Sequence, residues 1–498
     1  MRSRGLLLMA GLALLSPGCK TKPAEKGQPS ATAAGMGSMS RAVVSMGGAM
    51  RPAGMAASRP SAARPASKGL MARKEAVALA RKFIGFLRAA KWKEARALYA
   101  PQMRKTFGEA KLKEVWEKLV RQFGTFEKFD KGVWLLPKGD LAFVFLPSWW
   151  QKGKFDVIVP IQSTVGVAGI RVRFHEHHGD FPAPAYADQS KFVERQVTIG
   201  KGTPWELPGT LTRPKISKTV GAVVVVHGSG PQDRDATFGP NKPYRDLAWG
   251  LASRGIAVVR YDKRTKVHAQ RMVKLKKKLT HMQEYVDDAL AAVKLLASKK
   301  SHRPIYVVGH SDGAYTVPLI MKLAGDQVAG GVLLAGPSRQ LYENYLEQIL
   351  FLAKLRRVAD QPAVKAHIAT LKKAILKAKD PNLSAATPNR DLPMGASAHY
   401  WLARRAYKHK QIARALAVPL LVLNGQRDYQ VTATDFSGWK AALRGKGNAF
   451  FRMYPGLNHF FMKGQGPPNP REYYRPAHVE VRVIEDIAHF VRKQQLRK

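Results

Sequence analysis

From residue 191 onward, short apolar runs alternate with stretches in which apolar residues recur every three or four positions. The apolar runs predict strands at residues 222–226, 257–261, 305–308, 331–334, 418–423 and 449–454. The helical spacing predicts helices at residues 244–253, 282–296, from 312 onward and at 477–491. Repeated strand–helix units predict an α/β fold, a mostly parallel sheet with helices on both faces. Residues 196–199 and 209–212 predict an antiparallel pair that opens this domain of residues 191–498.

Two further segments flank or interrupt this pattern. Residues 70–180 have helical spacing first and then strand-like runs at 141–146, 155–161 and 169–174, which predicts a small α+β accessory domain. We expect Trp149 and Trp150 to lie in its core. About eighty residues separate the strands at 331–334 and 418–423, and their amphipathic runs predict a helical lid over about residues 340–416.

The beginning of the chain has the features of an export signal. Arg2 and Arg4 precede an apolar stretch at residues 5–15, which is too short to span a membrane, and Cys19 follows. This arrangement resembles a bacterial lipoprotein signal, although Ser16 stands where Leu is usual. The alternative is a plain secretory signal at residues 1–19. We expect the protein to be exported and lipid-anchored in the cell envelope, or otherwise periplasmic or secreted, with residues 20–69 as a disordered tether.

Charge and composition narrow the classes of function. The net charge is +48, and Cys19 is the single cysteine, so an intrachain disulfide is excluded. Such a charge favours anionic partners. The run of residues 263–278 is basic, contains no acid and follows the predicted strand at 257–261, so we expect it at the sheet edge where the loops after parallel strands open. It is either a solvated surface run or a basic surface that draws the protein to an anionic membrane, envelope or substrate. No nucleic-acid recognition motif, nucleotide-binding loop or cofactor motif is evident. His175, His177 and His178 are better explained as solvated residues at a strand end than as metal ligands, and we expect no metal.

A Gly-x-Ser-x-Gly sequence stands between a predicted strand and a predicted helix. It comprises residues 309–313, with Ser311 at its centre. This context is the one that a nucleophile elbow requires, since the two glycines relieve crowding at a sharp turn. The alternative is a tight turn with a capping serine.

A serine hydroxyl needs a base that is held by an acid. Asp428 and His459 each follow a predicted strand, so both belong to the sheet edge that carries Ser311. Asp435 is a second candidate acid, but it falls in the next helix. His478 and His489 are candidate bases that the terminal helix should carry away. For the oxyanion hole we expect the backbone N–H of Asp312 and one from Ser229 or Gly230, in the small-residue loop after residue 226. Residues 233–235 are expected to form an ion-paired brace.

These motifs together resemble a known family. The runs HGSGPQDRD, GHSDGA, LNGQRD and GLNHFF are similar to those of a bacterial esterase family of α/β-hydrolases, related to serine-aminopeptidase-like hydrolases. Some members carry an N-terminal accessory domain. The resemblance implies an α/β-hydrolase fold, hydrolysis of small carboxylic esters, and Ser311, Asp428 and His459 as the triad. It names no natural ester.

Two other functions remain open on the sequence alone. A serine peptidase would use the same triad on an amide bond. A non-catalytic envelope-binding protein would use the hydrolase fold only as a scaffold, although the intact triad argues against this.

Overall fold

The computed structural model describes residues 73–138, 140–151, 153–162, 165–174, 181–275 and 279–493. The predicted signal, Cys19, the tether, His175, His177 and His178 lie outside these residues, as do Lys276, Lys277 and Lys278. The described residues form two compact units, one within residues 73–174 and the other within residues 181–493. Each unit is described by itself below.

The N-terminal unit packs four helices against an antiparallel sheet. The helices are α2 (Arg73–Arg88), α3 (Trp92–Ala97), α4 (Pro101–Thr106) and α5 (Glu109–Phe123). The strands are β1 (Phe126–Phe129), β2 (Trp134–Lys138), β3 (Leu141–Trp150), β4 (Gly153–Gln162), β5 (Gly166–Val167) and β6 (Arg171–Phe174), with β3 and β4 at the centre. Trp150 is buried in the core against Trp116 and Phe123. The expectation for Trp149 is wrong: its side chain is 39% exposed, because neighbouring strand residues face opposite sides of the sheet.

The second unit has an eight-stranded sheet, which confirms the predicted α/β-hydrolase fold. The strands, in spatial order, are β14 (Ala449–Tyr454), β13 (Leu420–Gly425), β12 (Gly330–Leu334), β11 (Ile305–His310), β9 (Gly221–Val226), β10 (Ile256–Tyr261), β8 (Leu207–Pro214) and β7 (Phe192–Ile199). β7 and β8 are antiparallel to each other, and β8 is antiparallel to β10. All the other neighbouring pairs of this sheet, β10–β9, β9–β11, β11–β12, β12–β13 and β13–β14, are parallel. Every residue of β9 is buried, as its apolar run predicts for a strand covered on both faces.

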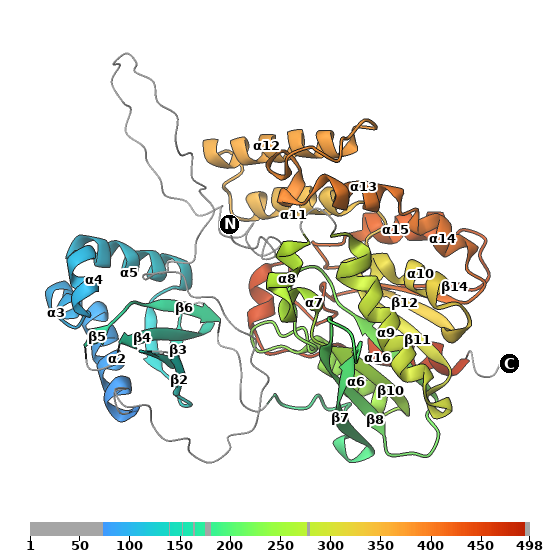
Figure 1. The fold of residues 1–498 in the computed structure, drawn as a ribbon, viewed down its shortest axis with the longest axis horizontal. Coiled ribbons are helices and arrows are strands. Elements are labelled where there is room, and N and C mark those ends of the chain that lie inside the picture. Colours follow the sequence, from blue (N-terminus) through green and yellow to red (C-terminus); the bar gives the residue numbers. More distant parts are fainter. Residues whose placement is uncertain are drawn as a thin grey trace. The chain divides into compact units, whose positions relative to one another are not determined.

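Helices cover both faces of this sheet (Figure 1). α9 (Asp287–Ala297), α10 (Asp312–Ala324) and α15 (Ala433–Ala442) contribute to one apolar cluster with the sheet. α6 (Pro243–Ala252) and α16 (Val481–Lys493) contribute to the other. Two predicted boundaries shift: residues 282–286 form a π-helical turn before α9, and α16 begins at Val481. His478 therefore precedes the terminal helix, contrary to expectation.

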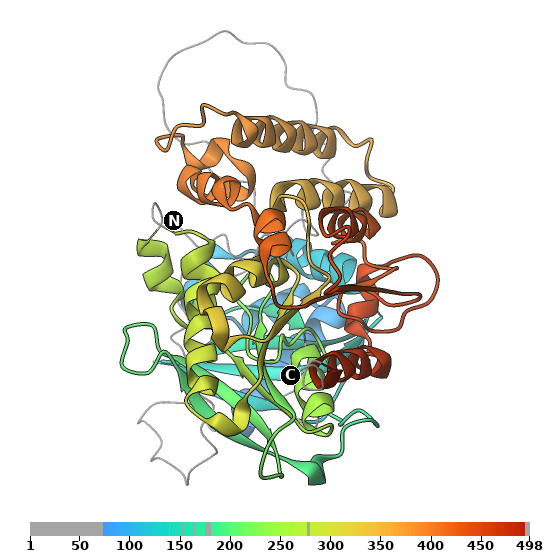
Figure 2. The same ribbon diagram turned by 90° about the vertical axis from the view of Figure 1, so that its right-hand side faces the viewer.

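The segment between β12 and β13 is helical and lies at one end of the unit. It contains α11 (Leu341–Leu355), α12 (Pro362–Lys379), α13 (Ala398–Ala406) and α14 (His409–Ala415). Figures 1 and 2 show α12 as the outermost of these helices, with α11 and α13 between it and the sheet. We call residues 341–415 the lid. Among the described residues, no helix is both long enough and apolar enough to cross a membrane.

Candidate active site

Ser311 occupies a strained turn between β11 and α10. Its φ of 56° and ψ of −125° lie in a region that serine rarely adopts. A Cβ on Gly313 would lie 2.2 Å from the carbonyl oxygen of His227, and one on Gly309 would lie 2.5 Å from Cγ2 of Val317. Only glycine fits at these two positions. The Gly-x-Ser-x-Gly sequence therefore forms a sharp elbow that presents Ser311 at the end of β11.

Asp428 and His459 are brought together from two different loops. Asp428 follows β13 and His459 follows β14, and Nδ1 of His459 lies 2.7 Å from Oδ2 of Asp428. The other carboxylate oxygen, Oδ1, accepts hydrogen bonds from the backbone N–H groups of Gln430 (2.7 Å) and Val431 (3.0 Å). Both side chains are buried. The carboxylate is thus fixed, and it orients the ring of His459 with the proton on Nδ1.

The other candidate acids and bases have different partners. Asp435 lies in α15, where its carboxylate accepts from Arg339 (2.7 Å) and Asn344 (2.7 Å). His478 bonds to Asp246 (3.0 Å). His489 is exposed on α16. None of the three contacts His459 within the residues that the structure describes.

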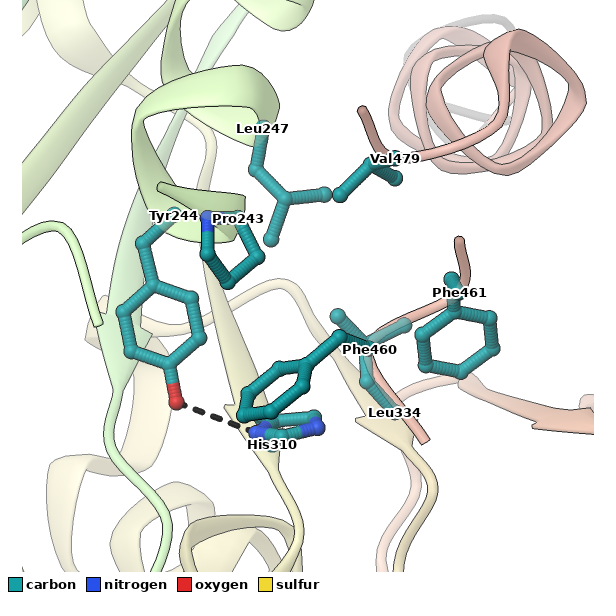
Figure 3. A pocket seen from close by; sticks show the side chains of 8 residues that line it. All are labelled: Pro243, Tyr244, Leu247, His310, Leu334, Phe460, Phe461 and Val479. Carbon is teal, nitrogen blue, oxygen red and sulfur yellow. Dashed lines mark hydrogen bonds between the residues drawn. The ribbon is translucent and has the colours of Figure 1, made fainter. Parts of the chain in front are cut away.

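His310, the residue before Ser311, connects three segments of the site. Its Nε2 lies 2.9 Å from the carbonyl oxygen of His459, and its Nδ1 lies 3.1 Å from the hydroxyl of Tyr244. The dashed line in Figure 3 marks the contact with Tyr244. A carbonyl oxygen can only accept, so Nε2 carries the proton and Tyr244 donates to Nδ1. The Tyr244 oxygen in turn accepts from the N–H of Gly228 (3.2 Å). Burial lowers the pKa of His310 well below its ordinary value, so the ring is neutral.

This connection was not predicted from the sequence. His310 stands inside the serine motif, but its two partners come from α6 and from the loop after β14, which local sequence patterns cannot bring together. The rings of His310 and His459 are 4.6 Å apart, measured between centroids. Ser311 and His459 share no direct hydrogen bond in the described part of the chain, and His310 provides the link between them.

The loop of residues 227–231 passes close to Ser311. A Cβ on Gly228 would lie 3.1 Å from the Cβ of Ser311. The backbone N–H groups of Ser229, Gly230 and Asp312 donate to no acceptor among residues 73–493 as far as these are described. Asp312 is also the first residue of α10, where the helix dipole favours negative charge. All three groups thus retain a hydrogen bond that they could donate to an anion.

Residues 233–235 form the ion-paired brace that the sequence predicts. Arg234 pairs with Asp262 (3.0 Å) and Asp235 with Arg260 (2.9 Å). These contacts join the loop after β9 to β10 and to the residue that follows it.

The basic run begins in the interior, contrary to expectation, although its later residues Lys266, Arg271 and Lys274 are exposed as expected. Lys263 and Arg264 are only 1% and 4% exposed. Lys263 donates to Glu284 (2.9 Å) and to the carbonyl oxygen of Gly228 (2.9 Å), and Arg264 donates to Asp288 (3.0 Å). The count of lysines and arginines in this run could not distinguish a buried, ion-paired lysine from one that faces the solvent. Lys263 therefore supports the loop beside Ser311.

The chain is similar to several known proteins. Residues 217–464 match the family model described as serine aminopeptidase, S33. The chain is 32% identical over 411 residues to the Esterase EstD of Thermotoga maritima, a match that covers 82% of this chain and 94% of that one. Among solved structures, it is similar to the esterase domain of a Rhodothermus marinus protein (14% identity, TM-score 0.36, covering 60% of this chain and 98% of that chain). It is also similar to Est1E from Butyrivibrio proteoclasticus (15% identity, TM-score 0.38, covering 60% and 99%). The match to Esterase EstD over most of both chains shows that this chain belongs to the α/β-hydrolase family of carboxylic ester hydrolases.

Proposed function

We propose that this protein hydrolyses small carboxylic esters through a Ser311–His459–Asp428 triad. The observation that carries the proposal is the 2.7 Å contact between His459 and Asp428, close to a strained serine whose neighbour His310 bonds to the main chain of His459. A serine held in this way becomes a nucleophile when His459 accepts its proton on Nε2.

The reaction has two halves. The Oγ of Ser311 attacks the ester carbon while its proton passes to His459, and the resulting oxyanion binds the N–H of Asp312 and that of Ser229 or Gly230. The tetrahedral intermediate collapses to an acyl-enzyme, and His459 gives the proton to the departing alcohol. Water then attacks the acyl-enzyme with His459 as general base, which releases the acid and restores Ser311. Asp428 orients His459 and stabilises the positive charge that the ring carries transiently in each half of the reaction.

The second candidate is a peptidase with the same triad, which the description of the matching family model favours. We expect esters to be the better substrates, because an alcohol is a better leaving group than an amine. The measurement is kcat/KM for p-nitrophenyl acyl esters of increasing chain length beside aminoacyl and peptide p-nitroanilides. Amide turnover that equals or exceeds ester turnover would decide for the peptidase.

We also propose that the protein is exported and anchored through a lipid on Cys19. The support is the sequence pattern of residues 1–19, in which the single cysteine follows an apolar stretch of signal length. A fatty-acid analogue fed to expressing bacteria should label the wild type and leave Cys19→Ser unlabelled. Equal labelling of both would place the lipid elsewhere.

A further inference from the structure

A lid residue makes a buried ion pair with the residue that follows the candidate nucleophile. Arg404, on α13, donates from Nη2 to Oδ1 of Asp312 (2.8 Å) and from Nη1 to Oδ2 (3.1 Å). The two side chains are 0% and 1% exposed. Burial opposes the charged form of Asp312, but the Arg404 guanidinium outweighs it, and the pKa of Asp312 is lowered. The pair is therefore charged on both sides.

Both partners are held by further contacts. The hydroxyl of Tyr285 donates to Oδ2 of Asp312 (2.8 Å). The guanidinium of Arg404 lies 4.2 Å from the ring centroid of Tyr315, and its Nη1 also donates to the Tyr400 hydroxyl (3.3 Å). A buried ion pair contributes little net stability, since desolvation offsets the attraction. This arrangement instead restricts the position of Asp312.

The position of Asp312 matters because of its main chain. Its backbone N–H has no acceptor among the described residues and stands directly after Ser311, where it is the expected oxyanion donor. Two parallel hydrogen bonds to the carboxylate fix its direction as well as its place. Holding the side chain of Asp312 therefore holds the peptide unit that carries this donor.

The opposite wall of the site is joined to the same network. Lys263 donates to the carbonyl oxygen of Gly228, next to the second candidate donor, Ser229. Glu284 accepts from Lys263 (2.9 Å) and from the hydroxyl of Tyr400 (3.4 Å), which is one helical turn before Arg404 on α13. One lid helix is thus connected to the residues behind both sides of the expected oxyanion hole.

We propose that Arg404 is a positioning residue for the oxyanion hole and acts through the Asp312 carboxylate. The hole is therefore complete only when α13 is packed against the residues around Asp312. This inference rests on the proposed function, because the hole serves the Ser311 reaction. The Arg404 side chain is 0% exposed, so the proposed role is indirect, through Asp312.

The test compares Arg404→Met with Arg405→Gln. Arg405 is the next residue on α13, and among the residues that the structure describes its guanidinium bonds only within the lid, to the carbonyl oxygens of Asp380 and Pro381. With p-nitrophenyl acetate, kcat per active site should fall about 10- to 100-fold in Arg404→Met, while KM changes by less than about twofold. The affinity for a boronic acid inhibitor, whose tetrahedral adduct places an oxygen in the hole, should fall by a similar factor. Arg405→Gln should match the wild type in all three.

Fluorophosphonate titration counts the active sites, so partial unfolding does not imitate the effect. If Arg404→Met fails to fold by circular dichroism, Arg404→Lys decides, because it keeps the charge and one contact and should show a smaller loss of kcat. Wild-type kcat per site in the folded variant overturns the inference. A loss expressed only as a KM that rises with acyl length also overturns it, and points to a lid that binds substrate. Ser311→Ala with normal turnover would instead overturn the proposed function.

Discussion

Ser311→Ala is expected to lower kcat for p-nitrophenyl esters by roughly 10⁶-fold, to the level left by binding and the oxyanion donors alone. The hydroxyl supplies the bond to the acyl group, and no other side chain can replace it at the tip of the elbow. The backbone should be unaffected, because the φ of 56° at this position is imposed by the close packing of Gly309 and Gly313 and not by the serine side chain.

The measurement is steady-state hydrolysis together with fluorophosphonate labelling. The variant should keep the circular dichroism spectrum of the wild type and take up no label. Turnover within about tenfold of the wild type, in a preparation free of contaminating esterase, would remove Ser311 from the reaction and the triad with it.

Asp428→Asn is expected to lower kcat by about 10⁴-fold. The reason lies in the two backbone N–H groups of Gln430 and Val431, which donate to Oδ1 of Asp428. They hold the oxygen of the asparagine amide in that place, so its NH₂ group faces Nδ1 of His459. His459 must then accept on Nδ1 and carry its proton on Nε2, which is the tautomer that cannot take a proton from serine.

The matched control is Asp435→Asn, at the other buried carboxylate that follows β13 along the chain. Its carboxylate holds Arg339 and Asn344, so kcat per titrated active site should stay within about threefold of the wild type even if the protein loses stability. A larger loss in Asp435→Asn than in Asp428→Asn would mean that the acid of the site has been assigned wrongly.

The sequence predicted the parallel core of the sheet and the elbow because both depend on neighbouring residues. Five consecutive apolar residues, mostly β-branched, define β9, and a pair of glycines around Ser311 defines the turn. The link through His310 and Tyr244, the ion pair of Arg404 with Asp312, and the burial of Lys263 were not predicted. Each depends on a partner from a distant segment, and side-chain chemistry alone does not reveal which polar residues find partners in the interior. β1 and β2 were missed because four or five residues carry too little periodicity.

The pairing of Asp312 with Arg404 has a consequence for the charge balance of the site. A carboxylate directly after the nucleophile would repel the negative charge that develops on the substrate oxygen, and in a buried setting this repulsion is strong. Arg404 cancels it, so the acidic residue is tolerated only while the arginine is present. The two positions should therefore be substituted together. In a protein that lacks Arg404, a neutral residue at position 312 should leave a higher activity than the unpaired aspartate.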